Sequence, residues 1–156
     1  MAMAITLREF FDSHPLAHDT VEHEYSLSGL RNAETAHLPG DMVAKSVLLH
    51  DGAGYLLAVV PATHRLDLGR LHKILGRHVG LATEEEIAQV FGDCEIGAIP
   101  PAGLIYDIDT IVDEALLAQP EIYFEAGDHE TLIHMNCEDF RKLVGDATRM
   151  NISHHM

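Results

Sequence analysis

The feature that most constrains the fold is a pair of apolar segments joined by a short glycine-containing loop. Residues 42–50 and 55–60 are rich in Val, Leu and Ala, and Asp51-Gly52-Ala53-Gly54 separates them. Two such segments around a Gly/Asp turn predict a β-hairpin. Pro61, which lacks a backbone N–H, is expected to end it. The chain therefore contains a sheet, and its other segments are interpreted around that hairpin.

Alternating and apolar patterns predict further strands, and helical spacing predicts helices between them. The strands are expected at residues 20–26, 104–109, 121–126 and 130–135. Helices are expected after a capping box at Thr6 and Glu9, over residues 30–37, along the stripe Leu68, Leu71 and Leu75 up to Gly76, after a capping box at Thr83 and Glu86, and from Asn136 through Leu143. Strands outnumber helices and many connections are short. The fold class is therefore α+β, with a mixed, mostly antiparallel sheet.

Length and charge bound the organisation and the partners. A chain of 156 residues corresponds to one domain, expected over 1–150 with a flexible tail at 151–156. The net charge of −15 repels phosphate over most of the surface, which excludes broad nucleic-acid binding, DNA included, and leaves only a local basic patch. The first residues lack the apolar region of a secretory signal, and no apolar run approaches the roughly 20 residues of a membrane span. Cys94 and Cys137 form no CxxC pair, which fits a reducing cytoplasm.

Lys45 is the most informative single residue. In a strand its side chain shares one face with Val43, Val47 and Leu49, so it is the only charge among apolar neighbours. Because burying an unpaired ammonium costs several kcal/mol, such a lysine either reaches a cleft or pairs with a carboxylate. The alternative is a strand-edge lysine whose ammonium extends to water.

The segment Gly97 to Gly103 is the second candidate. Two prolines and two glycines deny it regular structure. A loop of this composition leaves backbone N–H groups free and lets a ligand approach the main chain, as oxyanion and phosphate sites require. The alternative is a plain connection between elements.

Other catalytic patterns find no support in the sequence. His129 and His134 have a spacing of i, i+5, which places them on opposite faces of a strand, so no metal site is predicted. The chain has no P-loop, GxGxxG or nucleophile elbow, so we expect no cofactor and no covalent nucleophile.

A small basic group is the one place where a phosphate backbone would be attracted. Arg70, Lys73 and Arg77 have the spacing of one helical face, opposite the leucine stripe. The alternative is an ordinary solvated face.

The order of these features resembles the YbaK family, the aminoacyl-tRNA deacylases related to the editing domain of bacterial prolyl-tRNA synthetases. The resemblance runs over roughly residues 20–145 and rests on an ordered set of segments. These are Val43-Ala44-Lys45-Ser46-Val47, Leu56 to Pro61, Arg65-Leu66-Asp67-Leu68, Leu81 to Glu86, a Gly-x-x-x-Pro loop from Gly97 to Pro101, Val112 to Leu116, and Glu121 to Gly127.

The resemblance implies a mixed sheet partly closed into a barrel and flanked by helices. It implies hydrolysis of the ester that joins a wrong small amino acid, such as Ala or Cys, to the 3′ end of tRNA, commonly tRNA for proline. Lys45, Gly97 and Pro101 match the family's catalytic positions. Ser46, the loop residues Ala98, Ile99 and Pro100, and His129 are expected to line the substrate pocket.

Two departures from the family bear on function. Many members read Pro-Phe-Gly where this chain reads Pro101-Ala102-Gly103, which reshapes the expected pocket. The acidic surface points to weak tRNA binding or to delivery by a partner such as prolyl-tRNA synthetase. Two other functions stay open: a non-catalytic module of this fold that binds a synthetase, a tRNA end or a small metabolite, and a hydrolase of an unrelated small ester.

Overall fold

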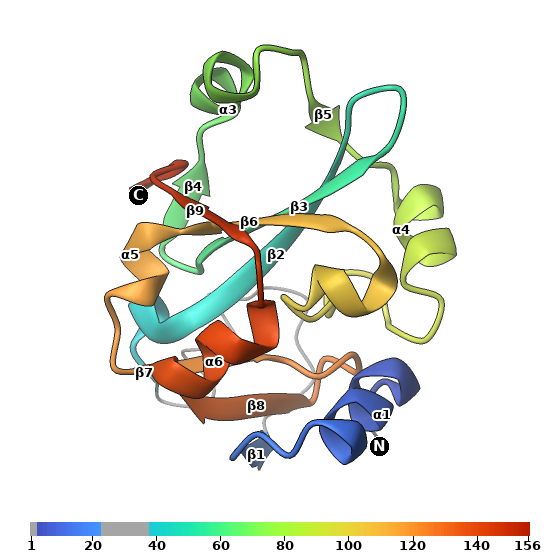
Figure 1. Ribbon diagram of the computed structural model, residues 1–156, viewed down its shortest axis with the longest axis vertical. Helices are drawn as coiled ribbons and strands as arrows, with labels where there is room; N and C mark the ends of the chain where they lie inside the picture. Colours follow the sequence, from blue (N-terminus) through green and yellow to red (C-terminus); the bar gives the residue numbers. More distant parts are fainter. Residues whose placement is uncertain (1–2, 23–37) are drawn as a thin grey trace.

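The protein is built on one large mixed sheet. The computed structural model describes residues 3–22 and 38–156. Its eight-stranded sheet has the order β1-β8-β7-β2-β3-β6-β9, with β5 paired to β2, and β10 and β4 form a second, two-stranded sheet (Figure 1). The strands are β1 (Asp19–Glu22), β2 (Val43–His50), β3 (Tyr55–Pro61), β4 (His64–Leu66), β5 (Gly80–Leu81), β6 (Asp109–Asp113), β7 (Glu121–Glu125), β8 (Thr131–Asn136), β9 (Thr148–Met150) and β10 (Ser153–His155).

Helices connect and cover these strands. They are α1 (Ile5–Ser13), α3 (Leu68–Leu75), α4 (Glu84–Val90), α5 (Glu114–Leu117) and α6 (Cys137–Val144), with short 3₁₀ segments η1 (Gly40–Met42) and η2 (Gly103–Tyr106). Figure 1 shows α3 at one end of the molecule and α1 with α6 at the other. The expected α+β class is confirmed.

The hairpin predicted from the sequence lies at the centre of the sheet. β2 and β3 pair antiparallel from Ala44↔Pro61 to His50↔Tyr55. β7 pairs parallel with β2, and β6 pairs parallel with both β3 and β9, whereas the other pairings are antiparallel. The sheet is therefore mixed and mostly antiparallel, as predicted. It stays open, with β1 and β9 as its outermost strands.

The two faces of the hairpin bury two different clusters. Ala44, Leu48 and Val59 belong to the larger one, which includes Phe124 of β7 and Phe140 of α6. Alternate residues of the same strands point to the opposite face. There Leu49, Ala58 and Val60 pack with Leu71 of α3 and Ile152. Successive side chains of β2 therefore point alternately toward the larger and the smaller cluster.

Several helix ends follow from local sequence as predicted. Thr83 and Glu86 form the capping box at the start of α4. The Asn136 side chain accepts from the Asp139 N–H at the start of α6. Gly76 ends α3 in the left-handed conformation, with φ of 69°.

The capping box predicted at Thr6 and Glu9 was wrong. The residue before α1 is Ala4, which makes no side-chain cap. The N–H of Thr6 instead donates to Asp93 Oδ2 at 2.7 Å, a residue far along the chain. A tertiary contact has replaced the local cap.

The strand expected at 104–109 was also wrong. Residues Gly103–Tyr106 form η2, Asp107 is left-handed with φ of 60°, and β6 starts only at Asp109. Gly103 is buried, and a Cβ there would meet the side chains of Thr110 and Leu57. The tight turn is fixed by this close packing, which the apolar composition of the segment does not reveal.

The tail expected at 151–156 is part of the fold. Ser153–His155 form β10 against β4, and the side chain of Ile152 is fully buried. In this otherwise polar segment, the buried side chain of Ile152 and the pairing of β10 with β4 hold the chain in place. In the N-terminal part, the strand predicted at 20–26 is β1 over Asp19–Glu22, and residues 23–26 and the helix predicted at 30–37 lie outside the described residues.

Candidate functional site

Strand β2 has a central stretch that none of the described strands covers along one edge. β3 pairs with Ala44–His50 on the other edge. On this edge β7 reaches only Val43 and Ala44, β5 pairs with Leu49 and His50, and the N–H of Ala82 after β5 donates to the carbonyl of Leu48 at 3.0 Å. Among the described strands, residues 45–47 therefore have no partner here, and we call them the β2 window. A gap between two strands on one edge leaves room for a loop or a ligand.

Lys45 lies in the β2 window and borders a pocket. Its Nζ donates to the backbone carbonyl oxygen of His64 in β4 at 2.9 Å. The pocket has a volume of about 220 Å³ and is lined by Lys45, Val47, Arg65, Leu66, Leu68, Leu81 and Met156. The cleft interpretation of Lys45 thus agrees with the structure. The pocket combines two basic groups with apolar walls, which suits a ligand that has both a negative charge and an apolar part.

The environment of Lys45 makes its ammonium unusual. Burial lowers the pKa of Lys45, and the neighbouring Arg65 guanidinium lowers it further. The carbonyl of His64 fixes the direction of the ammonium, because it occupies one of its three donors. Among the described residues, the ammonium has no other acceptor, so its other donors can reach a ligand in the pocket.

The Gly97–Pro101 loop begins with a tight turn. The N–H of Ala98 donates to the carbonyl of Glu95 at 3.0 Å, and Gly97 has a φ of 87°. This positive φ at the third position of the turn favours glycine. The following residues, Ala98 to Ala102, are buried. Within the described part of the chain, the backbone N–H groups of Gly97 and Ile99 have no hydrogen-bond acceptor, so they are available as donors.

His129 holds this loop from the turn that follows β7. It has a φ of 61° and is fully buried, and its Nε2 lies 2.5 Å from the carbonyl oxygen of Ile96. The N–H of Glu95 also donates to the carbonyl of Gly127, at 2.8 Å. The structure therefore brings the loop and His129 together, whereas the sequence had predicted His129 only as a residue of the pocket. The ring contacts the backbone next to the loop and fixes the loop's position.

Lys45 and Ser46 point to opposite faces of β2. Ser46 pairs with Val59 of the larger cluster, whereas Lys45 pairs with Val60 of the smaller one. The loop residues Ile99 and Ala102 pack in the larger cluster, on the side of Ser46. The Ser46 hydroxyl is buried and has no hydrogen-bond partner among the described residues. The loop and Lys45 thus approach the β2 window from its two sides.

Ala102, where the resemblance led us to expect Phe, lies in this packed region. Its side chain is fully buried in the larger cluster, and the following Gly103 is buried as well. A phenylalanine at this position would need space that the cluster as packed does not leave. The neighbouring core has therefore been built around the small side chain.

Glu125 is a buried acid that sequence reasoning missed. It is 6% exposed, and burial, together with Asp128 and Glu95, raises its pKa to about 8. Val43 is in register with Tyr123, so Glu125 lies on the same sheet face as Lys45, just beyond the last β7 pair. By strand alternation Glu125 shares a face with the exposed Glu121, so its burial gives no signal in the sequence.

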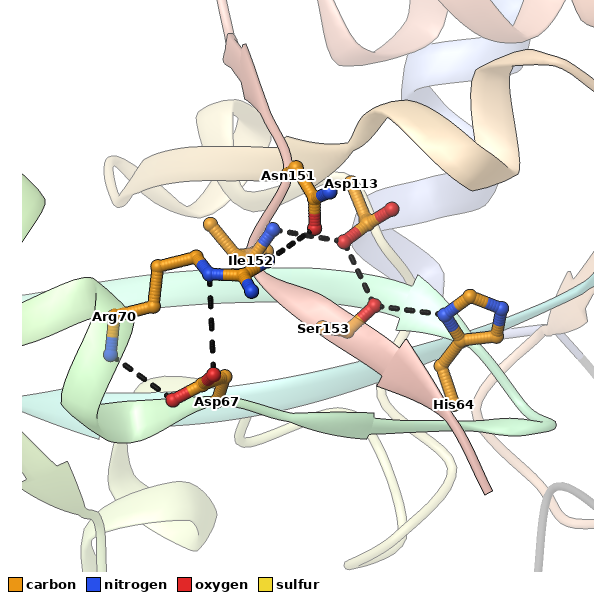
Figure 2. Close-up of polar contacts among 7 residues, drawn as sticks. All are labelled: His64, Asp67, Arg70, Asp113, Asn151, Ile152 and Ser153. Atoms are coloured by element: carbon orange, nitrogen blue, oxygen red, sulfur yellow. Dashed lines mark hydrogen bonds and ion pairs between the residues drawn. The ribbon is translucent and has the colours of Figure 1, made fainter.

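The basic group on and after α3 is less available than the sequence suggested. The prediction that all three residues share one helical face was wrong, because α3 ends at Leu75 and Arg77 follows its Gly76 cap. Arg70 contacts Asn151 at 2.6 Å and Asp67 at 3.8 Å (Figure 2). Arg77 is paired with Asp51 at 2.8 Å. Lys73 is exposed and, within the described residues, has no such partner.

Two other kinds of site find no candidate in the described residues. Within 3–22 and 38–156, no three His, Cys, Asp or Glu side chains gather so that they could hold a metal ion. The same residues contain no helix that is long and apolar enough to span a membrane.

Comparison with known proteins identifies the class. The family model described as the aminoacyl-tRNA editing domain matches residues 30–143, which is most of the chain. The chain belongs to this family, which agrees with the resemblance noted in its sequence. No curated protein compared with the chain matches it.

Solved structures share the fold at low sequence identity. One is a candidate trans-editing enzyme for prolyl-tRNA synthetase, with a TM-score of 0.83 and 24% identity over 97% of this chain and 96% of that one. Another is the hypothetical protein APE2540, with a TM-score of 0.84 and 21% identity over 96% and 99%. A third, a candidate signal transduction protein from Marinobacter aquaeolei VT8, has a TM-score of 0.75 and 23% identity, and covers 97% of this chain but 31% of its own. The fold therefore also occurs as part of a longer chain.

Proposed function

We propose that this protein is a trans-editing hydrolase that removes a wrong amino acid from aminoacyl-tRNA. The observation that carries the proposal is Lys45, whose ammonium is held by a backbone carbonyl at the pocket edge inside an editing-domain fold. The substrate class follows from the family. A small residue such as Ala or Cys on tRNA for proline is the proposed substrate.

The reaction needs little from the protein beyond positioning and stabilisation of charge. Water adds to the carbonyl carbon of the ester, and the carbonyl oxygen becomes an oxyanion. The tetrahedral intermediate then expels the ribose 3′ oxygen, which takes up a proton as the free amino acid leaves. Because the ester is already reactive, oriented donors and a held water are enough, without a covalent intermediate.

The two sides of the β2 window supply complementary groups for this reaction. The N–H groups of Gly97 and Ile99, which have no acceptor among the described residues, are suited to the oxyanion, and Pro101 stiffens the loop that presents them. Lys45 is suited to a phosphate or carbonyl oxygen of the substrate, as a compact point charge. Glu125, on the same face as Lys45, is a candidate for contact with the substrate's amino group.

Selection of the amino acid is proposed to depend on pocket size. None of the four predicted lining residues borders the Lys45 pocket. They lie on the loop side of the β2 window, where we propose that they contact the aminoacyl side chain. They are Ser46, Ala98, Ile99 and Pro100, and three of these four are buried. One methylene in an apolar pocket changes binding by only about 1–3 kcal/mol. We therefore expect clear discrimination by size and a modest preference between Ala and Cys.

Contact with the tRNA body is proposed to be weak. Arg70, Lys73 and Arg77 are the proposed tRNA contacts, but two of them already face acidic or amide groups. On a chain with a net charge of −15, this leaves little attraction for the phosphate backbone. Delivery of the acceptor end by prolyl-tRNA synthetase would compensate for that weakness.

The test is deacylation of tRNA for proline charged with Ala, Cys, Ser or Pro. The wild type is compared with Lys45→Ala, and with Lys142→Ala as a matched control, since Lys142 is an exposed lysine on α6. Rapid clearance of one mischarged species, lost at least a hundredfold in Lys45→Ala and kept in Lys142→Ala, supports the proposal. No clearance by folded wild-type protein would overturn it and favour a binding module. If the wild type hydrolyses a free aminoacyl ester as fast as it hydrolyses the mischarged tRNA, the protein is a small-ester hydrolase.

A further inference from the structure

The last strand, β10, closes over β4 next to Lys45. Ser153 pairs with Leu66 and His155 with His64. Ile152 is buried, and its carbonyl accepts from the N–H of Asp67 at 2.8 Å. The N–H of Met156 donates to the carbonyl of Thr63 at 3.0 Å. Residues 152–156 are therefore fixed to both ends of β4.

A buried polar chain anchors this strand to the large sheet. Asp113, at the end of β6, is 1% exposed and accepts from the N–H of Ile152 at 2.9 Å and from Ser153 Oγ at 2.7 Å (Figure 2). Ser153 Oγ lies 2.9 Å from Nδ1 of His64. A hydroxyl has one hydrogen, which Ser153 donates to Asp113, so His64 Nδ1 must be the donor to Ser153. Both hydrogen bonds are therefore donated in the same direction: His64 donates to Ser153, and Ser153 donates to Asp113.

This arrangement is not a catalytic triad. In a triad the histidine lies between the acid and the serine and removes the serine proton. Here the serine lies in the middle, is 5% exposed, and directs its hydrogen to the aspartate. Ser153 is therefore a structural link and no nucleophile.

The same short strand β4 connects this chain to Lys45. The side chain of His64 belongs to the polar chain, and its backbone carbonyl accepts from Lys45 Nζ. Arg65 and Leu66 of β4, and Met156 beyond β10, line the pocket of Lys45. A shift of β10 would therefore move both the acceptor that directs the ammonium and one wall of the pocket.

We propose that residues 152–156, held by Asp113, Ser153 and His64, form a positioning element for Lys45 and part of the wall of its substrate pocket. The inference rests on the proposed function only in assigning Lys45 to the substrate. Ser153 and Asp113 act through β4 and touch no substrate. Met156 is the residue of this segment that would contact a ligand.

The test compares Ser153→Ala and Asp113→Asn with a matched control, His154→Ala. His154 lies on the same strand but is exposed and outside the polar chain. One readout does not depend on tRNA: titration of the Lys45 side chain by NMR in protein carrying ¹³C-labelled lysine, assigned with Lys45→Arg. The second is kcat/KM for the mischarged tRNA that the wild type clears.

If the inference holds, Ser153→Ala and Asp113→Asn move the Lys45 titration to higher pH, because a looser wall exposes the ammonium. They also lower kcat/KM about tenfold, whereas His154→Ala changes neither. A chain shortened to end at Ile152 should show the same changes more strongly, and Ser153→Ala decides the matter if that chain does not fold.

Folded variants with a wild-type Lys45 titration and wild-type kcat/KM would overturn the inference. If the wild type clears no mischarged tRNA, the proposed function fails, and the Lys45 titration alone still decides whether this segment positions Lys45.

Discussion

The two sides of the β2 window are held in place by different means. On the side of the loop, much of the geometry is local, because Gly97 makes the turn and two prolines stiffen the chain; the hydrogen bond between His129 and Ile96 joins residues 33 positions apart and is the tertiary part. On the side of Lys45, the geometry depends on segments from distant parts of the sequence. His64 of β4 and Ser153 of β10, which are in contact, are 89 residues apart in the chain. Locally encoded geometry is visible in a sequence, whereas an assembled environment is not.

The largest expected effect tests the Lys45 side of the β2 window, whose geometry depends on distant segments. Lys45→Arg keeps the positive charge but replaces a compact ammonium with a planar guanidinium that does not fit the same acceptor. We expect deacylation to fall about a hundredfold, or about 2.7 kcal/mol of transition-state stabilisation. Steady-state kinetics on the mischarged tRNA measures it. Activity near wild type would mean that charge alone matters and that the precise environment of Lys45 does not.

The next largest effect tests the side of the β2 window that the Gly97–Pro101 loop occupies. Gly97→Ala forces a side chain into a φ of 87°, which costs about 1 kcal/mol and displaces the N–H donors of the loop. Gly52→Ala is the matched control, because Gly52 has a φ of 89° with open space around it, in the hairpin loop. Both variants should lose similar stability in urea, but only Gly97→Ala should lose activity, by about tenfold. Equal activity in the two would remove the loop from the mechanism.

A pH experiment tests the buried acid that lies on the face of Lys45. Because the pKa of Glu125 is raised to about 8 in the folded protein, folding favours its protonated form. The protonated Glu125 therefore contributes to the stability of the folded protein. This contribution is complete below the ordinary glutamate pKa, is lost as pH rises to about 8, and changes no further above pH 8.

The free energy of unfolding should therefore fall more steeply with pH in wild type than in Glu125→Gln. The free energy of unfolding of Glu125→Gln, relative to that of wild type, should rise by more than about 1 kcal/mol from pH 5 to pH 8 and then level off. Glu130→Gln, at an exposed neighbouring position, is the control. Parallel curves for wild type and Glu125→Gln would contradict the raised pKa.

The smallest effect concerns the basic group near α3. Reversing Arg70, Lys73 and Arg77 to Glu should weaken tRNA binding and flatten its salt dependence, and Lys73→Glu alone should give most of the change. The two arginines contribute less because they already have partners. Fluorescence anisotropy with tRNA at several salt concentrations measures it, with Lys142→Glu as control. Binding unaffected by the triple reversal would make this an ordinary solvated surface.

The predictable part of the fold consists of elements whose signals are short and self-contained. The hairpin, the Gly76 cap and the Thr83–Glu86 capping box each need only a few adjacent residues, and each is present in the structure. The failures have a common cause. The N–H of Thr6 finds Asp93 instead of a local cap, and the chain at Gly103 turns where the core leaves no space for a Cβ.

The candidate site divides in the same way. Lys45 and the Gly97–Pro101 loop were visible as residues that did not fit the pattern of an ordinary strand or connection. Glu125 was missed because an acid at one end of an amphipathic strand has no signal until its neighbours are known. From the resemblance, His129 was expected to line the pocket, but its bond to the backbone of Ile96 beside the loop required the structure.

By itself, the sequence determined the α+β class, the central hairpin, and the positions of a strand lysine and a Gly/Pro loop. It did so because side-chain periodicity, turn residues and caps act over a few residues. Only the tertiary structure decided what surrounds Lys45: the carbonyl of His64, the pocket walls and the order of residues 152–156. These depend on contacts between distant segments, where a single buried side chain such as Ile152 and one polar chain outweigh local composition.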